Sequence, residues 1–392
     1  MKKLLIYYPE RQLKPKGGPA GYLYNLKSGI DELAQNEELN IDISFYNNMP
    51  GGIEDNLGLR RMIPKRILDF RRALNDAIFL KKRFAVDQTM FEYDMIHFHS
   101  AEKMYLCRDF LNQYKGKVIL TSHCPCGIYK ERIDKLNPTD YKLMKKRIDK
   151  LEELDRYAFD RADYIIFPCE DAEEPYFNTW PRYASIRKSE KYRYMPTGIM
   201  ECHAKISRED YRKKYNIPKD AFVIGYVGRH NEIKGYDDLK KIGEKILADP
   251  NTYFLIGGKE EPLKGIKHDR WIEVGWTSDP YSLITAADIF ILPNRETYFD
   301  LVLLEVLSLG IPIALTNTGG NKYFKKYDKT GLKYFSTIKE GIAVINEFKK
   351  MSSEERKQAG QELSDLCRSE FSVKAFAGRY IQIITEIANA GE

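Results

Sequence analysis

The residues best suited to hold a charged ligand lie on one short segment in the second half of the chain. Gly228-Arg229-His230-Asn231-Glu232-Ile233-Lys234-Gly235 follows an apolar run and precedes an amphipathic stretch, which predicts a loop between a strand and a helix. Its two fixed cations, five residues apart, can hold a diphosphate between them while the helix N-terminus adds N–H donors. The alternative is a pair of solvated loop charges, but the flanking glycines and the position after a strand favour binding.

A carboxylate follows at a second expected strand end. The block 286–310 begins as an apolar strand, continues as a polar loop and ends as an apolar helix in which Glu305 is the single carboxylate. A carboxylate held there can accept hydrogen bonds from both hydroxyls of a ribose, as acidic residues do in dinucleotide-binding folds. The alternative is a glutamate on the exposed side of the helix.

The first half of the chain offers a weaker signal, the glycine-rich stretch Lys16-Gly17-Gly18-Pro19-Ala20-Gly21. Missing Cβ atoms let a backbone approach a ligand closely, although an ordinary turn has the same composition. The stretch matches neither G-x-G-x-x-G nor G-x-x-x-x-G-K-[ST]. The chain therefore lacks the signatures of a nicotinamide dehydrogenase and of a P-loop kinase.

Apolar runs that alternate with amphipathic stretches predict helices packed on mostly parallel sheets, an α/β fold. We expect two doubly wound sheets, with a seam near 195–199 where Pro and Gly interrupt the pattern, and helices over 208–215 and 372–388. The expected strands are 3–7, 41–46, 95–98, 118–121 and 164–167 in the first half, and 222–227, 253–256, 271–274, 289–292, 312–315 and 332–335 in the second.

Composition narrows the class of protein. With 392 residues, of which 43% are hydrophobic and 31% charged, the chain is long enough for two domains and too apolar to be disordered. A net charge of +6 is small for a dedicated nucleic-acid binder, so we expect no nucleic-acid partner. The six cysteines do not form a disulfide framework, and the chain has neither a signal-peptide core nor an apolar run long enough to span a bilayer, so we expect a cytoplasmic protein.

Four features together resemble glycosyltransferase family 4: the strand–loop–helix block, the Gly-Arg-x4-Lys-Gly loop, the segment Ala314-Leu315-Thr316-Asn317-Thr318-Gly319-Gly320 and the opening Gly17-Gly18. The resemblance spans nearly the whole chain and is clearest from Val223 to Gly320. It implies the GT-B fold, in which two Rossmann-like doubly wound domains face each other across a cleft. The implied parts are an acceptor-binding domain over 1–199, a donor-binding domain over 200–371 and a helix over 372–392 that crosses back to the first domain.

The resemblance also implies roles for individual residues. Arg229 and Lys234 match the pair that grips the donor diphosphate and neutralises it as it leaves. Glu305 matches the second glutamate of the E-x7-E motif, which binds the ribose, and His123 resembles the histidine beside the transferred sugar. The remaining implied donor-site residues are Gly17 and Gly18, and Phe299, Asp300 and Leu301, whose backbone amides would approach the sugar and the β-phosphate.

One position departs from the family pattern. Eight residues before Glu305 stands Thr297 in place of the first glutamate of E-x7-E, and the nearest carboxylate is Glu296. Either the loop shifts so that Glu296 reaches the sugar, or the Thr297 hydroxyl replaces it. The family's Gly-Gly-x-Pro-Glu is also changed, to Gly319-Gly320-Asn321-Lys322.

The reaction implied by the resemblance moves a hexose-type sugar from a nucleoside diphosphate, most often UDP, to an acceptor hydroxyl with retention at the anomeric carbon. Attack on the same face through an oxocarbenium-like state needs no protein nucleophile, and the leaving phosphate takes the acceptor proton. No cofactor and no obligatory metal are implied, because Arg229 and Lys234 supply the countercharge. The implied acceptor is a glycan, a lipid-linked sugar or a protein, in bacterial surface-polysaccharide or glycoconjugate assembly.

Two further features leave alternatives open. The segment 59–84 carries nine Lys and Arg against two Asp, with apolar residues at helical spacing. This pattern fits either peripheral contact with the inner face of an anionic membrane or a solvated helix face. A second cluster, with potential metal ligands near two strand ends, lacks the spacing of known zinc sites; its members are His97, His99, His123, Cys124 and Cys126.

Two other functions share parts of this pattern. A non-hydrolysing nucleotide-sugar epimerase has the same two-domain fold but would use carboxylate acid/base residues without an acceptor. The cation loop and Glu305 argue against it. A non-catalytic partner subunit with a degenerate donor site is the second alternative, and Thr297 is the residue that favours it.

Overall fold

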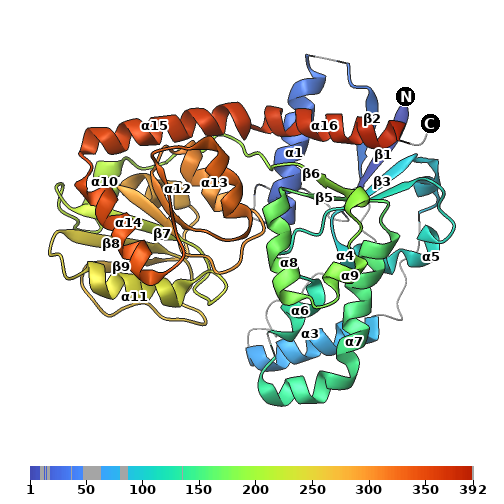
Figure 1. The fold of residues 1–392 in the computed structure, drawn as a ribbon, viewed down its shortest axis with the longest axis horizontal. Helices are drawn as coiled ribbons and strands as arrows, with labels where there is room; N and C mark the ends of the chain where they lie inside the picture. The colour runs from blue at the N-terminus through green and yellow to red at the C-terminus, as the bar shows by residue number, and fades with distance from the viewer. Residues whose placement is uncertain are drawn as a thin grey trace. The chain divides into compact units, whose positions relative to one another are not determined.

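The computed structural model describes residues 1–390 except 9–12, 14, 16–17, 37, 47–62, 80–86 and 135. Gly17 and much of the basic segment 59–84 therefore lie outside the described residues. The chain forms two compact units (Figure 1). Unit 1 comprises Met1–Phe167, Glu173–Met195 and Ala377–Glu392, and unit 2 comprises Pro168–Ala172 and Pro196–Phe376.

Unit 1 contains a six-stranded parallel sheet in the order β2-β1-β3-β4-β5-β6. Because β1 pairs with β2 on one side and with β3 on the other, the sheet changes direction between β1 and β3. In open parallel sheets, ligands bind beyond the carboxyl ends of the strands at such a switch point. The strands are β1 Lys2–Tyr7, β2 Ile41–Phe45, β3 Met95–Phe98, β4 Lys117–Leu120, β5 Tyr164–Phe167 and β6 Tyr192–Tyr194.

The helices of unit 1 begin with α1, directly after the glycine-rich stretch, and end with α16, most of which belongs to this unit. The longest is α7, whose Asn137 cap accepts hydrogen bonds from the N–H groups of the first helical turn. The helices are α1 Pro19–Ala34, α3 Lys65–Phe79, α4 Ala101–Leu106, α5 Arg108–Leu111, α6 Ile128–Ile133, α7 Pro138–Arg161, α8 Glu174–Thr179, α9 Tyr183–Ile186 and α16 Val373–Asn389.

Unit 2 contains a second six-stranded parallel sheet, in the order β12-β11-β10-β7-β8-β9, and its switch point lies between β7 and β10. The strands are β7 Phe222–Val227, β8 Thr252–Gly257, β9 Trp271–Gly275, β10 Ile289–Leu292, β11 Ile313–Thr316 and β12 Leu332–Phe335. The helices are α10 Arg208–Lys214, α11 Tyr236–Ile246, α12 Pro280–Ala286, α13 Leu301–Ser308, α14 Ile338–Lys350 and α15 Ser353–Glu370.

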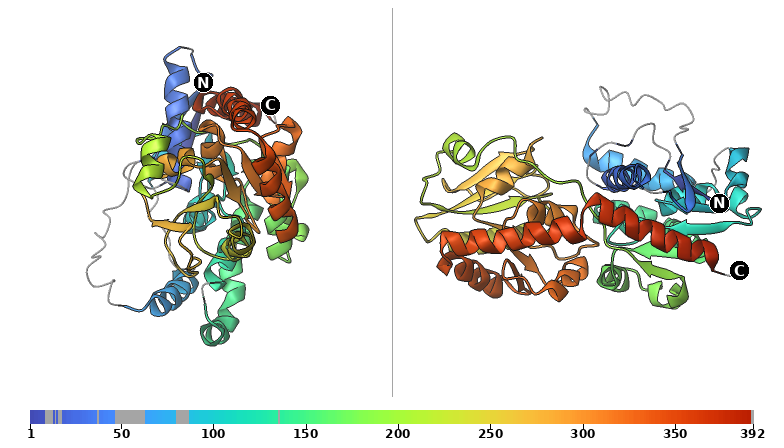
Figure 2. Two further views of the ribbon diagram at one scale, coloured as in Figure 1. Left: turned by 90° about the vertical axis from the view of Figure 1, so that its left-hand side faces the viewer. Right: turned by 90° about the horizontal axis from the view of Figure 1, so that it is seen from above.

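Alternation along the unit 2 strands explains why helices cover both faces of this sheet (Figure 2). Phe222 and Ile224 belong to one buried cluster with α11 and α14, whereas Val223, between them, belongs to another cluster with α10 and α12. A strand that is apolar on both sides needs helices on both sides. The core therefore has two layers, one on each face.

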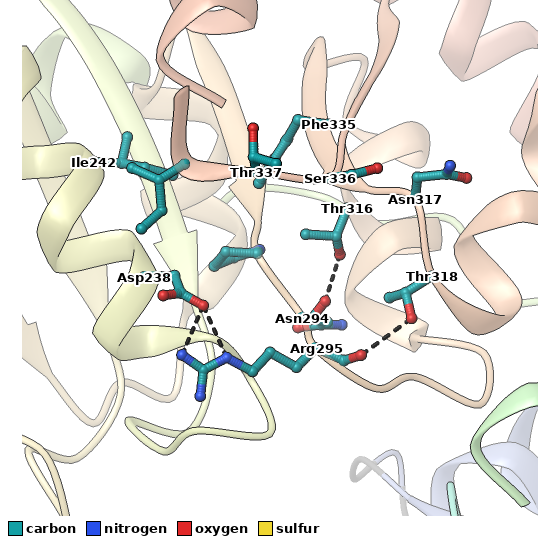
Figure 3. Close-up of a pocket in the computed structure, with 12 residues that line it drawn as sticks. Asp238, Ile242, Asn294, Arg295, Thr316, Asn317, Thr318, Phe335, Ser336 and Thr337 are labelled. Carbon is teal, nitrogen blue, oxygen red and sulfur yellow. Dashed lines mark hydrogen bonds and ion pairs between the residues drawn. The ribbon is translucent and has the colours of Figure 1, made fainter. Parts of the chain in front are cut away.

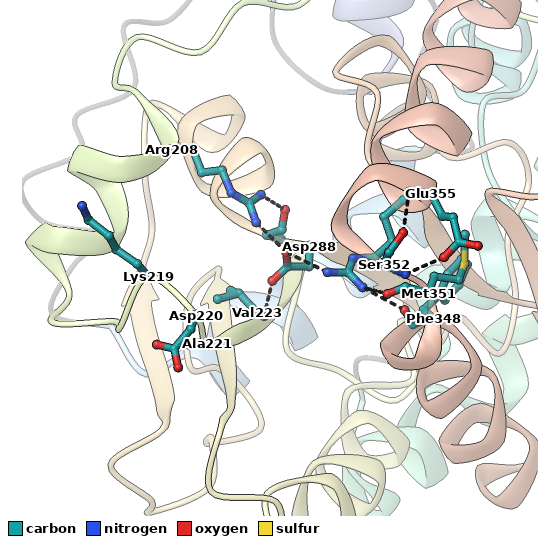
Figure 4. A network of polar contacts seen from close by, with 12 residues as sticks. Arg208, Lys219, Asp220, Ala221, Val223, Asp288, Phe348, Met351, Ser352 and Glu355 are labelled. Carbon is teal, nitrogen blue, oxygen red and sulfur yellow. Dashed lines mark hydrogen bonds and ion pairs between the residues drawn. The ribbon is translucent and has the colours of Figure 1, made fainter.

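A carboxylate at the amino end of β10 ties three helices and a neighbouring strand together (Figure 4). Asp288 accepts hydrogen bonds from Arg208 at 2.5 Å, from Arg212 at 2.8 Å and from the N–H of Val223 at 2.7 Å. Arg356 of α15 lies 3.8 Å away and donates to main-chain carbonyl groups at the end of α14. This network holds α10 and α15 against the edge of the sheet opposite to the carboxyl ends of its strands.

The expected fold class is confirmed, since both doubly wound parallel sheets are present. All eleven expected strands form, with bounds that differ by at most one residue, and the units separate at 195/196, within the expected seam. One strand, β6, was not predicted, because Tyr192-Arg193-Tyr194 carries a charge at its centre and no apolar run. Among the described residues, no helix has the length and apolar character needed to cross a bilayer.

Candidate functional site

The cation loop follows β7 in unit 2 and is held against the loop that follows β10. Gly235, the N-cap of α11, has φ 63°, and a Cβ there would lie 1.8 Å from the carbonyl oxygen of Pro293. Only glycine accepts both this conformation and this distance. The N–H of Arg295 also donates to the carbonyl of Ile233 at 3.0 Å. The carboxyl ends of β7 and β10 therefore present one continuous surface at the switch point.

Lys234 and Asp300 meet on this surface. The Lys234 ammonium lies 2.5 Å from Asp300 Oδ2, and the Asn294 amide donates to the same oxygen at 2.8 Å. Burial by itself raises the pKa of Asp300, but Lys234 and Asn294 outweigh this effect and lower the pKa below its ordinary value. Asp300 is therefore ionised, and the Lys234 cation already has an anionic partner.

Arg229, the other cation of the loop, is exposed and forms no ion pair within the part of the chain that the structure describes. Its backbone is fixed, since its carbonyl accepts a hydrogen bond from Tyr226 at 3.0 Å. The next residue, His230, is buried, and its ring stacks on Tyr236 with 3.9 Å between the centroids. Arg229 thus presents an exposed charge from a backbone that a hydrogen bond holds in place.

Glu305 lies on α13, half-buried, with Oε1 3.5 Å from the hydroxyl of Tyr281 on α12. Burial, followed by the negative charge of Asp300, raises the pKa of Glu305 to about 7, against a smaller opposing effect of Tyr281. Near neutral pH this carboxyl group is therefore close to half protonated. Because the charges of Asp300 and Glu305 interact, Lys234, Asp300 and Glu305 form one electrostatic cluster.

The residues between Asn294 and Asp300 are less accessible than the sequence suggested. Thr297 is 3% exposed, and its carbonyl accepts a hydrogen bond from the N–H of Gly320 at 3.2 Å. A Cβ on Gly319 would lie 2.1 Å from that same carbonyl oxygen, which explains the glycine there. Phe299 packs in an aromatic cluster with Phe324. The side chains of Thr297 and Phe299 are therefore packed inside the loop and stabilise it.

Two other residues of this loop remain partly accessible. Glu296 is half-buried, with its N–H 3.5 Å from the carbonyl of Ile233, and Leu301 is half-buried at the start of α13.

A pocket of about 280 Å³ adjoins this cluster on the side of β11 and β12 (Figure 3). Asn294 lines it, together with the hydroxyl side chains of Thr316, Thr318 and Thr337. Arg295, at its edge, is turned toward Asp238, to which its Nε donates at 2.8 Å. Asn294 therefore separates this pocket from the Lys234–Asp300 pair.

The switch point of unit 1 is occupied by aromatic and imidazole rings. His97 bonds to the hydroxyls of Tyr380 and Thr121, both at 2.9 Å, and His99 Nδ1 lies 2.8 Å from His123 Nε2. Burial lowers the pKa of His123 to about 3 and holds the pKa values of His97 and His99 well below their ordinary value. All three imidazoles are therefore neutral.

His123 has φ 59°, a conformation that non-glycine residues rarely adopt and that clusters at functional sites. Beside this cluster lies a pocket of about 300 Å³, and its lining includes His99, Ser100 and Ser122 at the ends of β3 and β4. The Nε2 atom of His99 is buried without a hydrogen-bond partner. Gly18, the N-cap of α1, has φ 77° with open space around its Cβ position.

The structure places no metal cluster among the residues it describes: no group of three His, Cys, Asp or Glu side chains has a suitable arrangement. Cys124 and Cys126 form no disulfide within the described part of the chain. Both ring nitrogens of His97 bond to hydroxyl groups.

Three residues of the unit 2 site were missed from the sequence: Asn294, Tyr281 and His230. Asn294 follows β10 directly, so its place after a strand was a usable signal. Tyr281 stands two residues after Asp279, which caps α12, and only the packing of α12 on α13 brings it near Glu305. His230 lies within the cation loop, but nothing in its spacing reveals that it is buried.

Comparison with known proteins gives a family match that covers the unit 2 site. Residues 207–363, which contain the whole unit 2 site, match the family described as "Glycosyl transferases group 1". The O-antigen biosynthesis glycosyltransferase WclY of Escherichia coli is 28% identical over 116 residues, which are 28% of this chain and 32% of WclY. The UDP-Gal:alpha-D-GlcNAc-diphosphoundecaprenol alpha-1,3-galactosyltransferase of Escherichia coli is 28% identical over 157 residues, 36% of this chain and 40% of that protein.

The structure of HepE from Anabaena in complex with UDP-glucose superimposes with a TM-score of 0.62 at 14% identity, over 98% of this chain and 100% of HepE. At this identity the likeness establishes the fold, which is the GT-B fold with two Rossmann-like domains. The sequence matches to WclY and to the galactosyltransferase span about a third of those proteins. Together the matches support a GT-B glycosyltransferase.

Proposed function

We propose that the protein is a retaining glycosyltransferase that moves a hexose-type sugar from a nucleoside diphosphate, UDP in the first instance, to an acceptor hydroxyl. The observation that carries the proposal is the cluster at the switch point of unit 2, where two cations and the Glu305 carboxylate stand at the ends of β7 and β10. This arrangement matches the charges of a nucleotide sugar: cations for the diphosphate and a hydrogen-bond acceptor for the ribose diol. Similarity to WclY and to the galactosyltransferase favours an acceptor in surface-polysaccharide assembly, either a glycan or a lipid-linked sugar.

In this proposal Arg229 and Lys234 act on the leaving group. As the bond between the anomeric carbon and the β-phosphate oxygen breaks, negative charge grows on the phosphate, and positioned cations stabilise it without a metal ion. Ionised Glu305 accepts hydrogen bonds from the ribose hydroxyls. His123 of unit 1 is neutral, so its ring nitrogen can form a hydrogen bond with a sugar without adding charge.

The proposal is tested by glycosyl transfer from radiolabelled UDP-glucose, UDP-galactose and UDP-N-acetylglucosamine to a panel of lipid-linked and free glycans. Thermal-shift measurements with UDP and the same sugar nucleotides identify the donor first, because a ligand that binds the folded state raises the melting temperature. Arg229→Ala should abolish most of the transfer and Arg295→Ala should not. If no nucleoside diphosphate or sugar nucleotide raises the melting temperature, the proposal is wrong.

The same experiments separate the two alternatives. An epimerase converts a sugar nucleotide into an isomer when no acceptor is present, and this isomer is detected by chromatography. A non-catalytic partner subunit is favoured by one observation, the buried Thr297 in place of a glutamate. It would bind the sugar nucleotide without transfer to any acceptor on the panel.

Peripheral membrane contact through 59–84 is a further part of the proposal, since an acceptor carried by a lipid would lie at a membrane. The guanidinium of Arg66, on α3, donates to Asp140 of α7 at 3.1 and 3.2 Å. One basic residue of the segment 59–84 therefore has a partner within unit 1. Flotation with anionic liposomes tests whether the other basic residues of the segment contact a membrane. Reversing the charges of Arg71, Arg72, Lys81 and Lys82 should abolish flotation, and unchanged flotation would contradict this part of the proposal.

A further inference from the structure

In the proposed function the loop after β10 contributes a group that contacts the donor sugar, and the sequence offers Thr297 and Glu296 as candidates. Thr297 is buried, and its backbone is locked to Gly320. Glu296 lies one residue earlier, with its backbone N–H directed at the loop that follows β7. The charge that acts on Glu305 comes from Asp300.

Asp300 has the contacts expected of a sugar-binding carboxylate. Its Oδ2 atom receives the Lys234 ammonium at 2.5 Å and the Asn294 amide at 2.8 Å, and its side chain is 12% exposed. The backbone N–H of Val302, at the start of α13, also donates to this carboxylate. Three donors thus fix the position of the carboxylate, and because its two oxygens can accept about four hydrogen bonds, acceptor capacity remains.

The covalent structure of a nucleotide sugar links this contact to the sugar. The anomeric carbon is joined to the β-phosphate through a single oxygen, so the cation that grips the β-phosphate lies close to the sugar ring. A carboxylate 2.5 Å from the Lys234 ammonium is therefore within reach of the ring hydroxyls. If Lys234 turns to the phosphate, Asn294 still holds Asp300, and sugar hydroxyls can replace the ammonium as donors.

We propose that Asp300 binds the hydroxyls of the donor sugar and takes the place of the carboxylate that is missing at Thr297. The proposal rests on the proposed function and deepens it by naming the residue that recognises the sugar. It has a second consequence: Asp300 competes with the diphosphate for Lys234. The site therefore favours a ligand that brings both a diphosphate and a sugar over the nucleotide that remains after transfer.

The test compares binding of UDP with binding of the UDP-sugar that gives the largest thermal shift, by isothermal titration calorimetry. For Asp300→Asn we expect the affinity for the UDP-sugar relative to UDP to fall about tenfold or more, because a charge-assisted hydrogen bond is lost. Affinity for UDP alone should stay equal or increase, since Lys234 is released from its partner. Asp220→Asn, a matched change on an exposed carboxylate before β7, should leave both affinities unchanged.

Each other outcome decides against the inference. Should Asp300→Asn keep the wild-type ratio while Glu296→Gln lowers it, Glu296 recognises the sugar. An Asp300→Asn ratio that matches the wild type in every nucleotide tested overturns the role of Asp300. If the wild-type protein binds neither UDP nor any UDP-sugar, the proposed function fails and this inference fails with it. If Asp300→Asn does not fold, Asp300→Glu replaces it in the test, because this variant keeps the charge and moves it by one methylene. It should change the order of preference among UDP-sugars.

Discussion

The switch points of the two units have the same architecture and opposite chemistry. In unit 2, a lysine, two carboxylates and an exposed arginine follow β7 and β10. In unit 1, three neutral imidazoles, tyrosine rings and hydroxyls follow β1, β3 and β4. The same type of parallel sheet thus supports a charged site in unit 2 and an uncharged one in unit 1. A charged nucleotide-sugar donor would need a charged site, and a neutral acceptor hydroxyl would need an uncharged one.

In each unit, a glycine starts the helix that follows the first strand of the sheet, and these two glycines repeat the contrast. Gly18 and Gly235 are both N-caps with positive φ, but the Cβ position of Gly18 is open while that of Gly235 collides with Pro293. A backbone contact at Gly235 fixes the loop of unit 2, whereas no described residue lies within 4 Å of a Cβ placed on Gly18. Rigid backbone is what a site needs to hold charges in place before a ligand arrives.

The variant with the largest expected effect tests whether the cations of the unit 2 site accelerate sugar transfer. Arg229→Ala should reduce the rate of sugar transfer by about 10²–10³-fold, about 3–4 kcal/mol, because a preorganised charge is lost where the leaving phosphate develops negative charge. Arg295→Ala is the matched control, since this nearby arginine is engaged by Asp238. Equal losses in the two variants would mean that general attraction, and not a specific clamp, explains the effect.

The second prediction concerns the two glycines. Gly235→Ala should lower the free energy of unfolding by about 2–4 kcal/mol, because strain from the positive φ adds to a steric clash with Pro293. Gly18→Ala should cost about 1 kcal/mol, because only the strain remains. Urea unfolding of both variants measures the difference. Similar losses would remove the distinction between a packed loop and an open one.

The third prediction uses the raised pKa of Glu305. Its pKa of about 7 lies above the ordinary value of 4.5, so burial stabilises the protonated form. The contribution of this group to stability is full below about pH 4.5 and is lost as the pH rises through about 7. Glu305→Gln should therefore raise the free energy of unfolding at pH 8 by about 1–2 kcal/mol and leave it unchanged near pH 4.5.

Glu305→Gln should weaken binding of the donor, although it stabilises the fold. Because the ionised carboxylate accepts the ribose hydroxyls, wild-type affinity for a UDP-sugar should fall as the pH drops below about 7, and Glu305→Gln should bind more weakly with no such dependence. Titrations between pH 5.5 and 8.5 measure this. A Gln variant that is stabilised yet keeps the wild-type pH profile would separate Glu305 from donor binding.

The smallest expected effect belongs to unit 1. Tyr380→Phe removes the hydroxyl that bonds to His97 and should cost about 1 kcal/mol of stability. Affinity for UDP, a property of unit 2, should stay within about twofold of wild type, since sites without shared partners behave independently. Tyr141→Phe, on the exposed surface of α7, is the control. A large loss of UDP affinity in Tyr380→Phe would show that the two units do not divide the work as described.

The sequence was sufficient for the strands because buried parallel strands leave continuous apolar runs such as Phe222–Val227. It was sufficient for the cation loop because Arg229, Lys234 and Gly235 are close in the chain. It was not sufficient for contacts between distant segments. Lys234 and Asp300 are 66 residues apart, and their ion pair depends on β7 and β10 being neighbours in the sheet. The position of Asp300 was predicted, but only its backbone was expected to matter.

Burial is the second quantity that the sequence hides. Thr297 and Glu296 looked equivalent as substitutes for a missing carboxylate, yet Thr297 is inside the loop. Its burial follows from the backbone approach of Gly319 and Gly320, which come from the loop after β11. Since the pKa of Glu305 also depends on burial, neither the accessible groups nor their charge at neutral pH could be derived from spacing alone.

The order of the chain carries a consequence for synthesis. Ala377–Glu392 belong to the same unit as the first strand, and Lys117 donates to the carbonyl groups of Ile387, Ala388 and Ala390. A ribosome must translate the chain as far as Tyr380 and Ala390 before His97 and Lys117 meet these partners. The first half of the chain to emerge is then the last to complete its fold, and a nascent chain that stops after Phe376 would contain all of unit 2 but an incomplete unit 1.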